Sequence, residues 1–214
     1  MSSAELGYGD IIMRVTHSSA GKTCFRKLRK RHDEAGHARE LTFSCYRRFL
    51  FLNRDRTRQW LIDSLLDARR RFPIDLWAYV IMPEHAHLLI YPREAGLKIG
   101  PVVGAIKEGV ARNAISYLKT HAPQWLPRIT VREGKRVRRR FWQPGGGYDR
   151  NVVELQTLQN MIDYIHMNPV RRALVTRSED WRWSSAQWYA GVRPVPIEMD
   201  KTLPMIVEDG RRVR

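Results

Sequence analysis

The chain has 214 residues, 43% hydrophobic and 28% charged, a balance that predicts one globular domain with extensions and excludes a collagen-like, low-complexity or largely disordered chain. Its 38 lysines and arginines exceed its 22 aspartates and glutamates by 16, an excess that no fold requires and that a polyanionic partner would favour. No apolar run approaches the roughly 18 residues that span a bilayer, and the N-terminus has no secretory pattern, so we expect a cytoplasmic protein without a membrane segment. The two cysteines cannot form a disulfide framework, and we expect no cysteine-based metal site.

The N-terminal part is predicted to be an extension followed by a strand and a helix. Residues 1–37 are polar, lack sustained periodicity and hold the basic cluster FRKLRKRH. From Glu40, apolar and polar residues alternate, as they do in a half-buried strand. After Asn53, apolar residues recur at helical spacing up to Phe72, and Pro73 ends this helix.

The middle of the chain predicts a β-hairpin and a second helix. The apolar runs 76–82 and 85–91 flank Pro83-Glu84, which suits a turn between two strands. Beyond Gly100, apolar side chains share one helical face, and the basic residues off that face are expected to be solvated. The apolar face consists of Val103, Ile106, Val110, Ala114 and Tyr117.

The last third predicts two short strands, a turn and a third helix. The strands are 128–132 and 136–142, and the glycine-rich stretch PGGGYDRN is interpreted as the turn. The helix that follows ends at Asn168-Pro169, because proline cannot continue a helix without disruption. Its core face consists of Leu155, Leu158, Ile162 and Ile165.

The order of strand, helix, hairpin, helix and strand predicts an α+β fold, a small antiparallel sheet with helices on one face. We expect three parts along the chain. Residues 1–37 form a basic N-terminal extension, residues 38–178 the main domain, and residues 179–214 a C-terminal appendage and tail.

Two histidines stand out within the sequence MPEHAHLL. His85 and His87 are two residues apart in a predicted strand, so their side chains project from the same face. Two imidazoles placed in this way can converge on one divalent ion, and imidazole is the commonest metal-binding side chain. The alternative is a chance pair of surface histidines.

A second candidate pair lies in MIDYIHMNP. Tyr164 and Asn168 are four residues apart near the end of a predicted helix and therefore share a face. A phenol can act as a covalent nucleophile once its proton is removed. The alternative is a tyrosine that packs its ring at the domain edge, with Asn168 as a helix cap.

Four stretches match a known family in order and spacing, namely MPEHAH, FWQPGGGYDRN, DYIHMNPVRRALV and DWRWSS. Over residues 38–190 the chain resembles the REP-associated tyrosine transposases, which belong to the single-tyrosine HUH transposases (histidine–hydrophobic–histidine) of bacterial insertion sequences. The combination is specific, although each short motif is not. Ala173 departs from the family pattern, which often has glycine at this position. Because of this alanine, we expect the chain to leave the helix by a different turn.

The resemblance implies a transposase on the ferredoxin-like palm of HUH nucleases, in agreement with the predicted element order. His85, His87 and Asn168 would bind a Mg²⁺ or Mn²⁺ ion, and Tyr164 would be the nucleophile. Attack of Tyr164 on the scissile phosphate would give a 5′-phosphotyrosine and a free 3′-hydroxyl, and a different 3′-hydroxyl would reverse the step. The implied substrate is single-stranded DNA carrying hairpins.

Two other functions stay open. A non-catalytic regulator derived from such a transposase would bind DNA hairpins, although it would not need to keep all four site residues. A metal-dependent phosphodiesterase would use water in place of Tyr164 and would cleave without a covalent adduct. We expect the protein to be nucleoid-associated and to act as a monomer or a homodimer.

Basic residues gather in two regions that we expect to contact phosphates. Residues 21–60 hold 12 basic and 4 acidic side chains, and residues 121–150 hold 8 and 2. In the second region the candidates are Arg136, Arg138, Arg139 and Arg140, with Trp142 as a surface for stacking an unpaired base. The alternatives are a compositional arginine bias for the charge and a core position for Trp142.

Overall fold

A computed structural model describes residues 13–17, 23–27 and 36–204, and the chain divides into two compact units, Met1–His32 and Asp33–Arg214. In the first unit, β1 (Met13–His17) and β2 (Thr23–Lys27) pair antiparallel. The predicted extension therefore contains a hairpin, which its lack of periodicity did not indicate. The part of the basic cluster beyond Lys27 lies outside the described residues.

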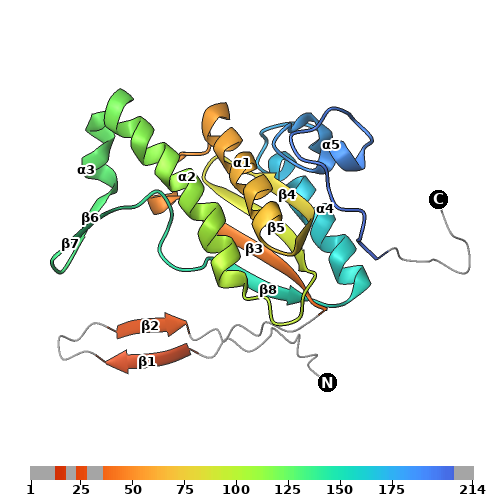
Figure 1. The fold of residues 1–214 in the computed structure, drawn as a ribbon, viewed down its shortest axis with the longest axis horizontal. Helices are drawn as coiled ribbons and strands as arrows, with labels where there is room; N and C mark the ends of the chain where they lie inside the picture. Colours follow the sequence, from red (N-terminus) through yellow and green to blue (C-terminus); the bar gives the residue numbers. More distant parts are fainter. Residues whose placement is uncertain (1–12, 18–22, 28–35, 205–214) are drawn as a thin grey trace, which may run out of the picture. The chain divides into compact units, whose positions relative to one another are not determined.

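The second unit is built on a four-stranded antiparallel sheet with the strand order β4-β5-β3-β8 (Figure 1). Two helices connect its strands, so the chain runs strand, helix, strand, strand, helix, strand, which with this strand order is the ferredoxin-like arrangement. The predicted fold class is confirmed. The elements are β3 (Ala38–Ser44), α1 (Asp55–Arg71), β4 (Ile74–Ile81), β5 (His85–Pro92), α2 (Ile99–His121) and β8 (Tyr148–Val152).

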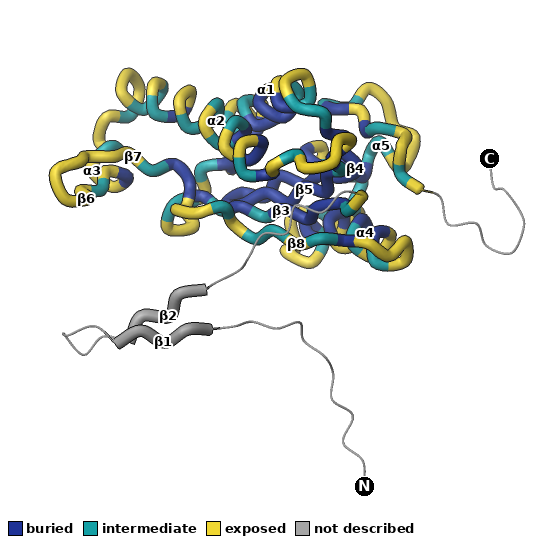
Figure 2. The backbone as a smooth tube through the Cα atoms, turned by 60° about the horizontal axis from the view of Figure 1, so that its bottom comes forward, coloured by how far each residue is buried: buried dark blue, intermediate teal, exposed yellow. Residues whose placement is uncertain are grey.

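The two connecting helices cover one face of the sheet, and a further helix, α4 (Leu155–Arg171), covers the other (Figures 1 and 2). Strand alternation decides which side chain meets which helix: Leu88 of β5 packs with α1 and α2, whereas Leu89 packs with α4. A β-bulge in β4 places both Trp77 and Ala78 on the α4 face. The prediction of helices on one face of the sheet holds for α1 and α2, whereas α4 forms an additional layer on the opposite face.

The last strand of this sheet, β8, lies where the sequence predicted only a glycine-rich turn. The two predicted strands before it exist as β6 (Thr130–Glu133) and β7 (Arg136–Arg139), but among the described strands they pair only with each other. Seven of their eight residues are exposed, so this hairpin stands clear of the core (Figure 2). We call residues 130–139 the basic arm.

The end of α4 differs from the prediction. Pro169 lies inside the last turn, and the helix continues to Arg171. Leu155, predicted to be in the core, is 42% exposed because it is the first residue of the helix. Ala173 adopts a left-handed φ of 52°, and the Leu174 N–H bonds the Pro169 carbonyl at 2.9 Å. The chain thus leaves the helix by the turn that glycine normally provides, and the expectation of a different turn is wrong.

Residues 178–204 run along β4, the edge strand of the sheet. The main-chain N–H of Ile81 donates to Trp183 O at 2.8 Å, and the N–H of Asp200 donates to Leu76 O at 3.1 Å. The segment includes the short helices η3 (Ser178–Asp180) and α5 (Ala186–Tyr189), and Trp183 is buried in the main core. Within the described part of the chain, no helix has the length and apolar character needed to cross a membrane.

Candidate active site

The paired histidines lie side by side on β5. Both point to the α4 face, as strand alternation predicts, and their Nε2 atoms are 3.1 Å apart. Both side chains are buried. Two nitrogen ligands at right angles on one ion, with bonds of ~2.1 Å, are about 3.0 Å apart, so this spacing fits a shared metal ion.

The outer ring nitrogens of both histidines have side-chain partners. Thr42 Oγ1 of β3 is 2.8 Å from His87 Nδ1, and Glu84 Oε1 is 3.1 Å from His85 Nδ1. Because an ionised carboxylate only accepts, His85 Nδ1 carries the proton and its Nε2 presents a lone pair. Thr42 lies opposite His87 in the β3–β5 register, so the sheet itself places this partner. Such outer partners orient metal-binding imidazoles.

Burial keeps both imidazoles neutral. It lowers the pKa of His87 to about 3, and the neighbouring His85 ring makes a smaller contribution in the same direction. Burial also lowers the pKa of His85, against the raising effect of Glu84. Since the neutral imidazole is the form that binds metals, both rings have at neutral pH the charge state that a metal ligand needs.

Glu84 connects His85 to two arginines. Its Oε1 accepts a hydrogen bond of 2.9 Å from Arg172 Nη1 and lies 3.9 Å from Arg48 Nη1. Burial acts to raise the pKa of this carboxyl, but the hydrogen bonds from Arg172 and His85 and the positive charge of Arg172 outweigh it, so the pKa lies below its ordinary value. Its Oε2 is buried without a hydrogen-bond partner among the described residues. Glu84 is therefore a fixed anion directly behind the histidine pair.

Tyr164 of α4 lies against the histidines. Its ring centroid is 5.7 Å from that of His87, with the two planes at 88°. The residue is 39% exposed, so a substrate can reach it. The guanidinium carbon of Arg171 lies 5.1 Å from the centre of the Tyr164 ring. A hydroxyl, two neutral imidazoles and a cation thus meet at one surface.

Asn168 lies one turn further along α4. It is buried, and its Nδ2 donates a hydrogen bond of 2.8 Å to the main-chain oxygen of Tyr164, which leaves the amide oxygen as the remaining acceptor. In the described part of the chain, no three His, Cys, Asp or Glu side chains gather in a metal-binding group. The residues here that could hold a divalent ion are therefore the two imidazoles, with the amide oxygen of Asn168 as a candidate third donor.

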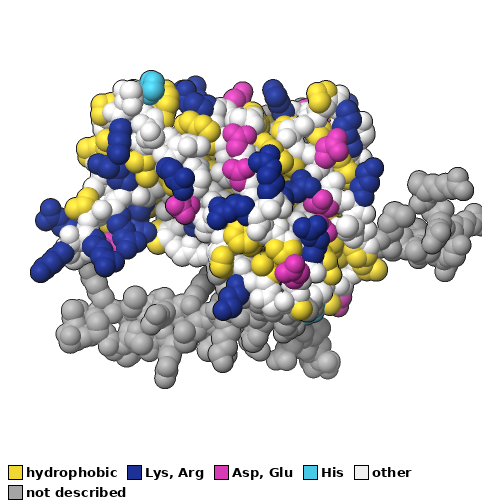
Figure 3. All heavy atoms as spheres, viewed as in Figure 1, with side chains coloured by type: hydrophobic (Ala, Val, Ile, Leu, Met, Phe, Trp, Pro, Cys, Tyr) yellow, Lys and Arg dark blue, Asp and Glu magenta, His cyan; other side chains and the backbone are white. Residues whose placement is uncertain are grey.

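The predicted DNA-contacting arginines fall into two groups. Arg136, Arg138 and Arg139 are exposed in the basic arm, where basic side chains gather (Figure 3). Arg140 is mostly covered, since only 18% of its side chain is exposed, and it pairs with Glu133. Arg138 Nε also lies 3.6 Å from Glu133 Oε2, so Glu133 pairs with two of the four arginines, and Arg140 is the one whose side chain is mostly covered.

Trp142 lies in the core. It is 6% exposed, its indole N–H donates to Lys107 O at 2.8 Å, and its ring meets Phe43 edge-on at 5.0 Å between centroids. With its ring packed and its donor satisfied, it has no face for a DNA base. We therefore remove Trp142 from the candidate DNA contacts in favour of its alternative, a core aromatic.

Three residues of this site had no role in the sequence analysis. Thr42 alternates with the core-facing Leu41 and so was already on the histidine face, but its partner depends on the register between two strands. Glu84 lies inside MPEHAH and was assigned only to a turn. No sequence signal indicated Arg172, whose contact joins positions 88 residues apart.

The fold and this surface define an α+β protein whose candidate active site joins paired imidazoles to an exposed tyrosine. No protein-family model matches the chain. A curated protein of Haemophilus influenzae, named "Putative REP-associated tyrosine transposase", is 29% identical over 153 residues, which cover 64% of this chain and 77% of that protein.

The solved structure of a REP-associated tyrosine transposase bound to a REP hairpin superimposes with a TM-score of 0.59. It is 20% identical, and the match covers 88% of this chain and 99% of that one. At this identity the structural likeness establishes the fold, while the curated relative carries the sequence likeness. The resemblance to the REP-associated tyrosine transposases is thereby confirmed.

Proposed function

We propose that this chain is a transposase that cleaves and rejoins single-stranded DNA next to hairpins, through a covalent link between Tyr164 and a 5′-phosphate. The observation that carries the proposal is the contact of the Tyr164 ring with His87, beside two imidazole Nε2 atoms 3.1 Å apart. It brings a hydroxyl nucleophile next to ligands for a divalent ion. The similar solved structure is that of a transposase bound to a REP hairpin, which supports hairpin DNA as the substrate of this chain.

In the cleavage step, the Tyr164 oxygen bonds to phosphorus and releases its proton, while the bond from phosphorus to the 3′-oxygen breaks and that oxygen takes up a proton. The tyrosine ester keeps the phosphodiester energy, so a second 3′-hydroxyl can displace Tyr164 and rejoin the strand. The Arg171 guanidinium beside the ring favours the negative charge that develops on the phenol oxygen.

His85, His87 and Asn168 would hold the divalent ion, Mg²⁺ or Mn²⁺, which withdraws charge from the scissile phosphate. The residues behind them set their geometry: Glu84 fixes the tautomer and orientation of His85, and Thr42 holds His87. The hydrogen bond from Asn168 Nδ2 to the main-chain oxygen of Tyr164 holds the Asn168 amide against the turn of α4 that carries the tyrosine.

The basic arm is assigned to the phosphate backbone of the DNA. Arg136, Arg138 and Arg139 are exposed, and the arm projects from the core as a two-stranded ribbon (Figures 1 and 3). Contacts of this kind give affinity that falls steeply with salt and carries little sequence information. Sequence preference would then come from elsewhere on the protein.

The experiment uses a pool of 3′-end-labelled single-stranded hairpin oligonucleotides with Mn²⁺, quenched in denaturant and separated on a protein gel, because the 5′-phosphotyrosine adduct retains the 3′ part of the strand. A labelled band at the mass of the protein is expected with the wild type and with Tyr189→Phe, a control at a comparably exposed tyrosine. The band should disappear with EDTA and with Tyr164→Phe, while DNA binding by Tyr164→Phe stays nearly intact.

The other outcomes separate the alternatives. An adduct that persists in Tyr164→Phe refutes the assignment of the nucleophile. Cleavage without an adduct, retained in Tyr164→Phe, identifies a phosphodiesterase that uses water. Tight binding of a hairpin without cleavage in any divalent metal identifies the regulator.

A further inference from the structure

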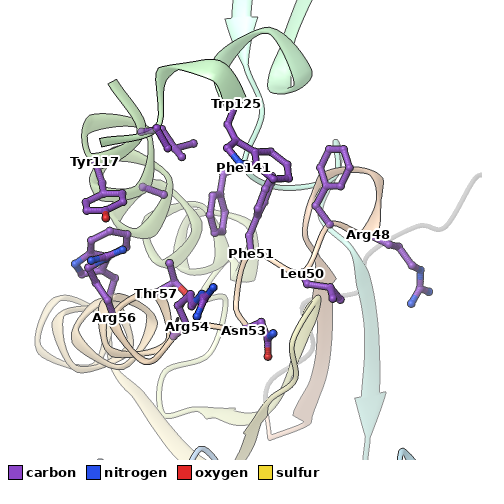
Figure 4. A pocket seen from close by; sticks show the side chains of 15 residues that line it. Arg48, Leu50, Phe51, Asn53, Arg54, Arg56, Thr57, Tyr117, Trp125 and Phe141 are labelled. Atoms are coloured by element: carbon purple, nitrogen blue, oxygen red, sulfur yellow. Dashed lines mark hydrogen bonds between the residues drawn. The ribbon is translucent and has the colours of Figure 1, made fainter. Parts of the chain in front are cut away.

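A cavity of about 540 Å³ lies between residues 48–60, the C-terminal half of α2 and the segments that flank the basic arm (Figure 4). Its volume is within the range of small-ligand sites. Most of its lining is aromatic or aliphatic, yet it includes three arginines, Arg48, Arg54 and Arg56, and no carboxylate. It contains none of the residues assigned to the metal or to the nucleophile.

Aromatic side chains form two walls of this cavity (Figure 4). In the first wall, Phe51 stacks on Phe141 with centroids 5.1 Å apart, and Trp125 meets Phe51 edge-on at 5.9 Å. In the second wall, the Arg56 guanidinium lies 3.6 Å from the centre of the Tyr117 ring. The Tyr117 ring also stacks with His121 at 4.1 Å between centroids, so the second wall presents the plane of the Arg56 guanidinium, whereas the first wall presents aromatic rings.

We propose that this cavity takes an unpaired nucleobase of the bound DNA strand, an inference that rests on the proposed function. A nucleotide joins a flat aromatic base to an anionic phosphate, and the cavity joins aromatic walls to arginines. An apolar protein segment would use the walls but would have no need of the three arginines. A positively charged ligand does not suit a lining that holds three arginines and no carboxylate.

The cavity is linked to both parts of the proposed DNA surface. Arg48 lines it and also lies 3.9 Å from Glu84, the partner of His85. Trp125 and Phe141, on its first wall, lie just before and just after the segment that carries the basic arm. The cavity lies on the side of the sheet that α1 and α2 cover, and Tyr164 lies on the α4 side, so we assign the base to the single-stranded segment beside the hairpin and not to the nucleotide at the scissile phosphate.

The test uses the full-length protein and a variant that fills the cavity. Ala122→Trp adds an indole to the lining, and the φ of −154° at Ala122 lies outside the left-handed region that favours glycine. Ser116→Trp, on the exposed side of α2, is the matched control, and circular dichroism checks the folding of both. Arg56→Ala, at an exposed side chain, is the second variant and removes the stacked cation.

The probe is a hairpin oligonucleotide with short randomised single-stranded flanks, selected by binding to the wild type. Each flanking nucleotide is then made abasic in turn, and affinity is measured by fluorescence anisotropy. One abasic position should weaken wild-type binding by about tenfold, as expected for the loss of one base–aromatic stack. Ala122→Trp should bind the intact probe about tenfold more weakly than the wild type, and its affinity should not change when that position is made abasic. Arg56→Ala should show part of both effects. Ser116→Trp should have the affinities of the wild type.

The proposal is overturned if the abasic substitution weakens binding equally in the wild type and in Ala122→Trp, or if no abasic position weakens binding to the wild type. The cavity would then bind a protein segment or a small molecule. The covalent-adduct assay, run on the same variants, separates this failure from that of the proposed function. An adduct with cavity-insensitive binding refutes only the base site. Cavity-sensitive binding with no adduct refutes only the chemistry, and a wild type that binds no hairpin refutes both.

Discussion

Gly147 is the position where a single methyl group should disturb both the fold and the candidate active site. Its φ is +78°, and a Cβ atom added there would lie 2.1 Å from the main-chain oxygen of Thr42 and 3.2 Å from Phe43 Cα. Thr42 cannot move away easily, because it belongs to the β3–β5 and β3–β8 ladders and its hydroxyl holds His87. A left-handed alanine costs roughly 1–2 kcal/mol and overpacking a further 1–3 kcal/mol, so we expect Gly147→Ala to destabilise the protein by about 2–5 kcal/mol.

Gly145→Ala is the matched control, two residues away. Gly145 has a φ of +90°, but an added Cβ would meet no atom within 4 Å, so only the conformational cost of about 1–2 kcal/mol applies. The assay is urea unfolding of both variants and the wild type, with the unfolding slopes compared. Equal losses of stability in the two variants would refute the close approach of Gly147 to Thr42.

Three further predictions concern the surroundings of the site. Ala173→Gly should raise the free energy of unfolding by about 1 kcal/mol, because glycine adopts a φ of 52° without strain; an unchanged urea midpoint would contradict this. Glu84→Gln should weaken Mn²⁺ binding to the DNA-free protein by about 10–100-fold, measured by calorimetry, whereas Glu108→Gln, at an exposed surface ion pair, should not. Burial lowers the pKa of His166 to about 4, so the unfolded chain binds more protons between about pH 6.5 and 4 and stability falls as the pH falls through this window. The stability advantage of the wild type over His166→Gln should therefore shrink by about 3 kcal/mol between pH 7 and pH 4 in denaturant unfolding, and a constant difference would contradict the assignment.

The sequence predicted the elements whose periodicity reflects burial. The side chains of β5 alternate between two packed faces, and α1 and α2 each present one apolar stripe to the sheet. The sequence periodicity of these elements therefore predicted them. β8 was missed because it is an edge strand with a single fully buried residue, Val152, and follows three glycines. Its place in the sheet comes from pairing with β3, a contact between positions about 110 residues apart that no local pattern encodes.

The candidate site was predictable only within single elements. The common face of His85 and His87 follows from strand parity, and the sequence placed them together correctly. The contact between His87 and Tyr164 depends on α4 packing against the face opposite to α1 and α2, which no periodicity announces. The same limit applies to the aromatic cavity, whose walls come from segments widely separated in the chain.

Backbone strain gathers around one buried carboxylate. Among the described residues, the non-glycine positions with positive φ are Arg47 (52°), Arg48 (54°) and Ala173 (52°). Arg48 lies 3.9 Å from Glu84, and Arg172, the neighbour of Ala173, donates to Glu84 at 2.9 Å. Two strained turns, far apart in the sequence, thus bring guanidinium groups to the same anion.

Stability alone does not account for this arrangement. The side chains of Arg48 and Arg172 are 71% and 51% exposed, and ion pairs of such exposed arginines add little to folding, whereas each left-handed residue opposes folding by roughly 1–2 kcal/mol. Strain of this kind persists where the surrounding structure fixes it and is concentrated at functional sites. Glu84 holds both guanidinium groups beside the paired histidines, where an incoming phosphate would compete with the carboxylate for them. Under the proposed function these turns have a role that stability does not give them, because they hold two guanidinium groups where the phosphate would bind.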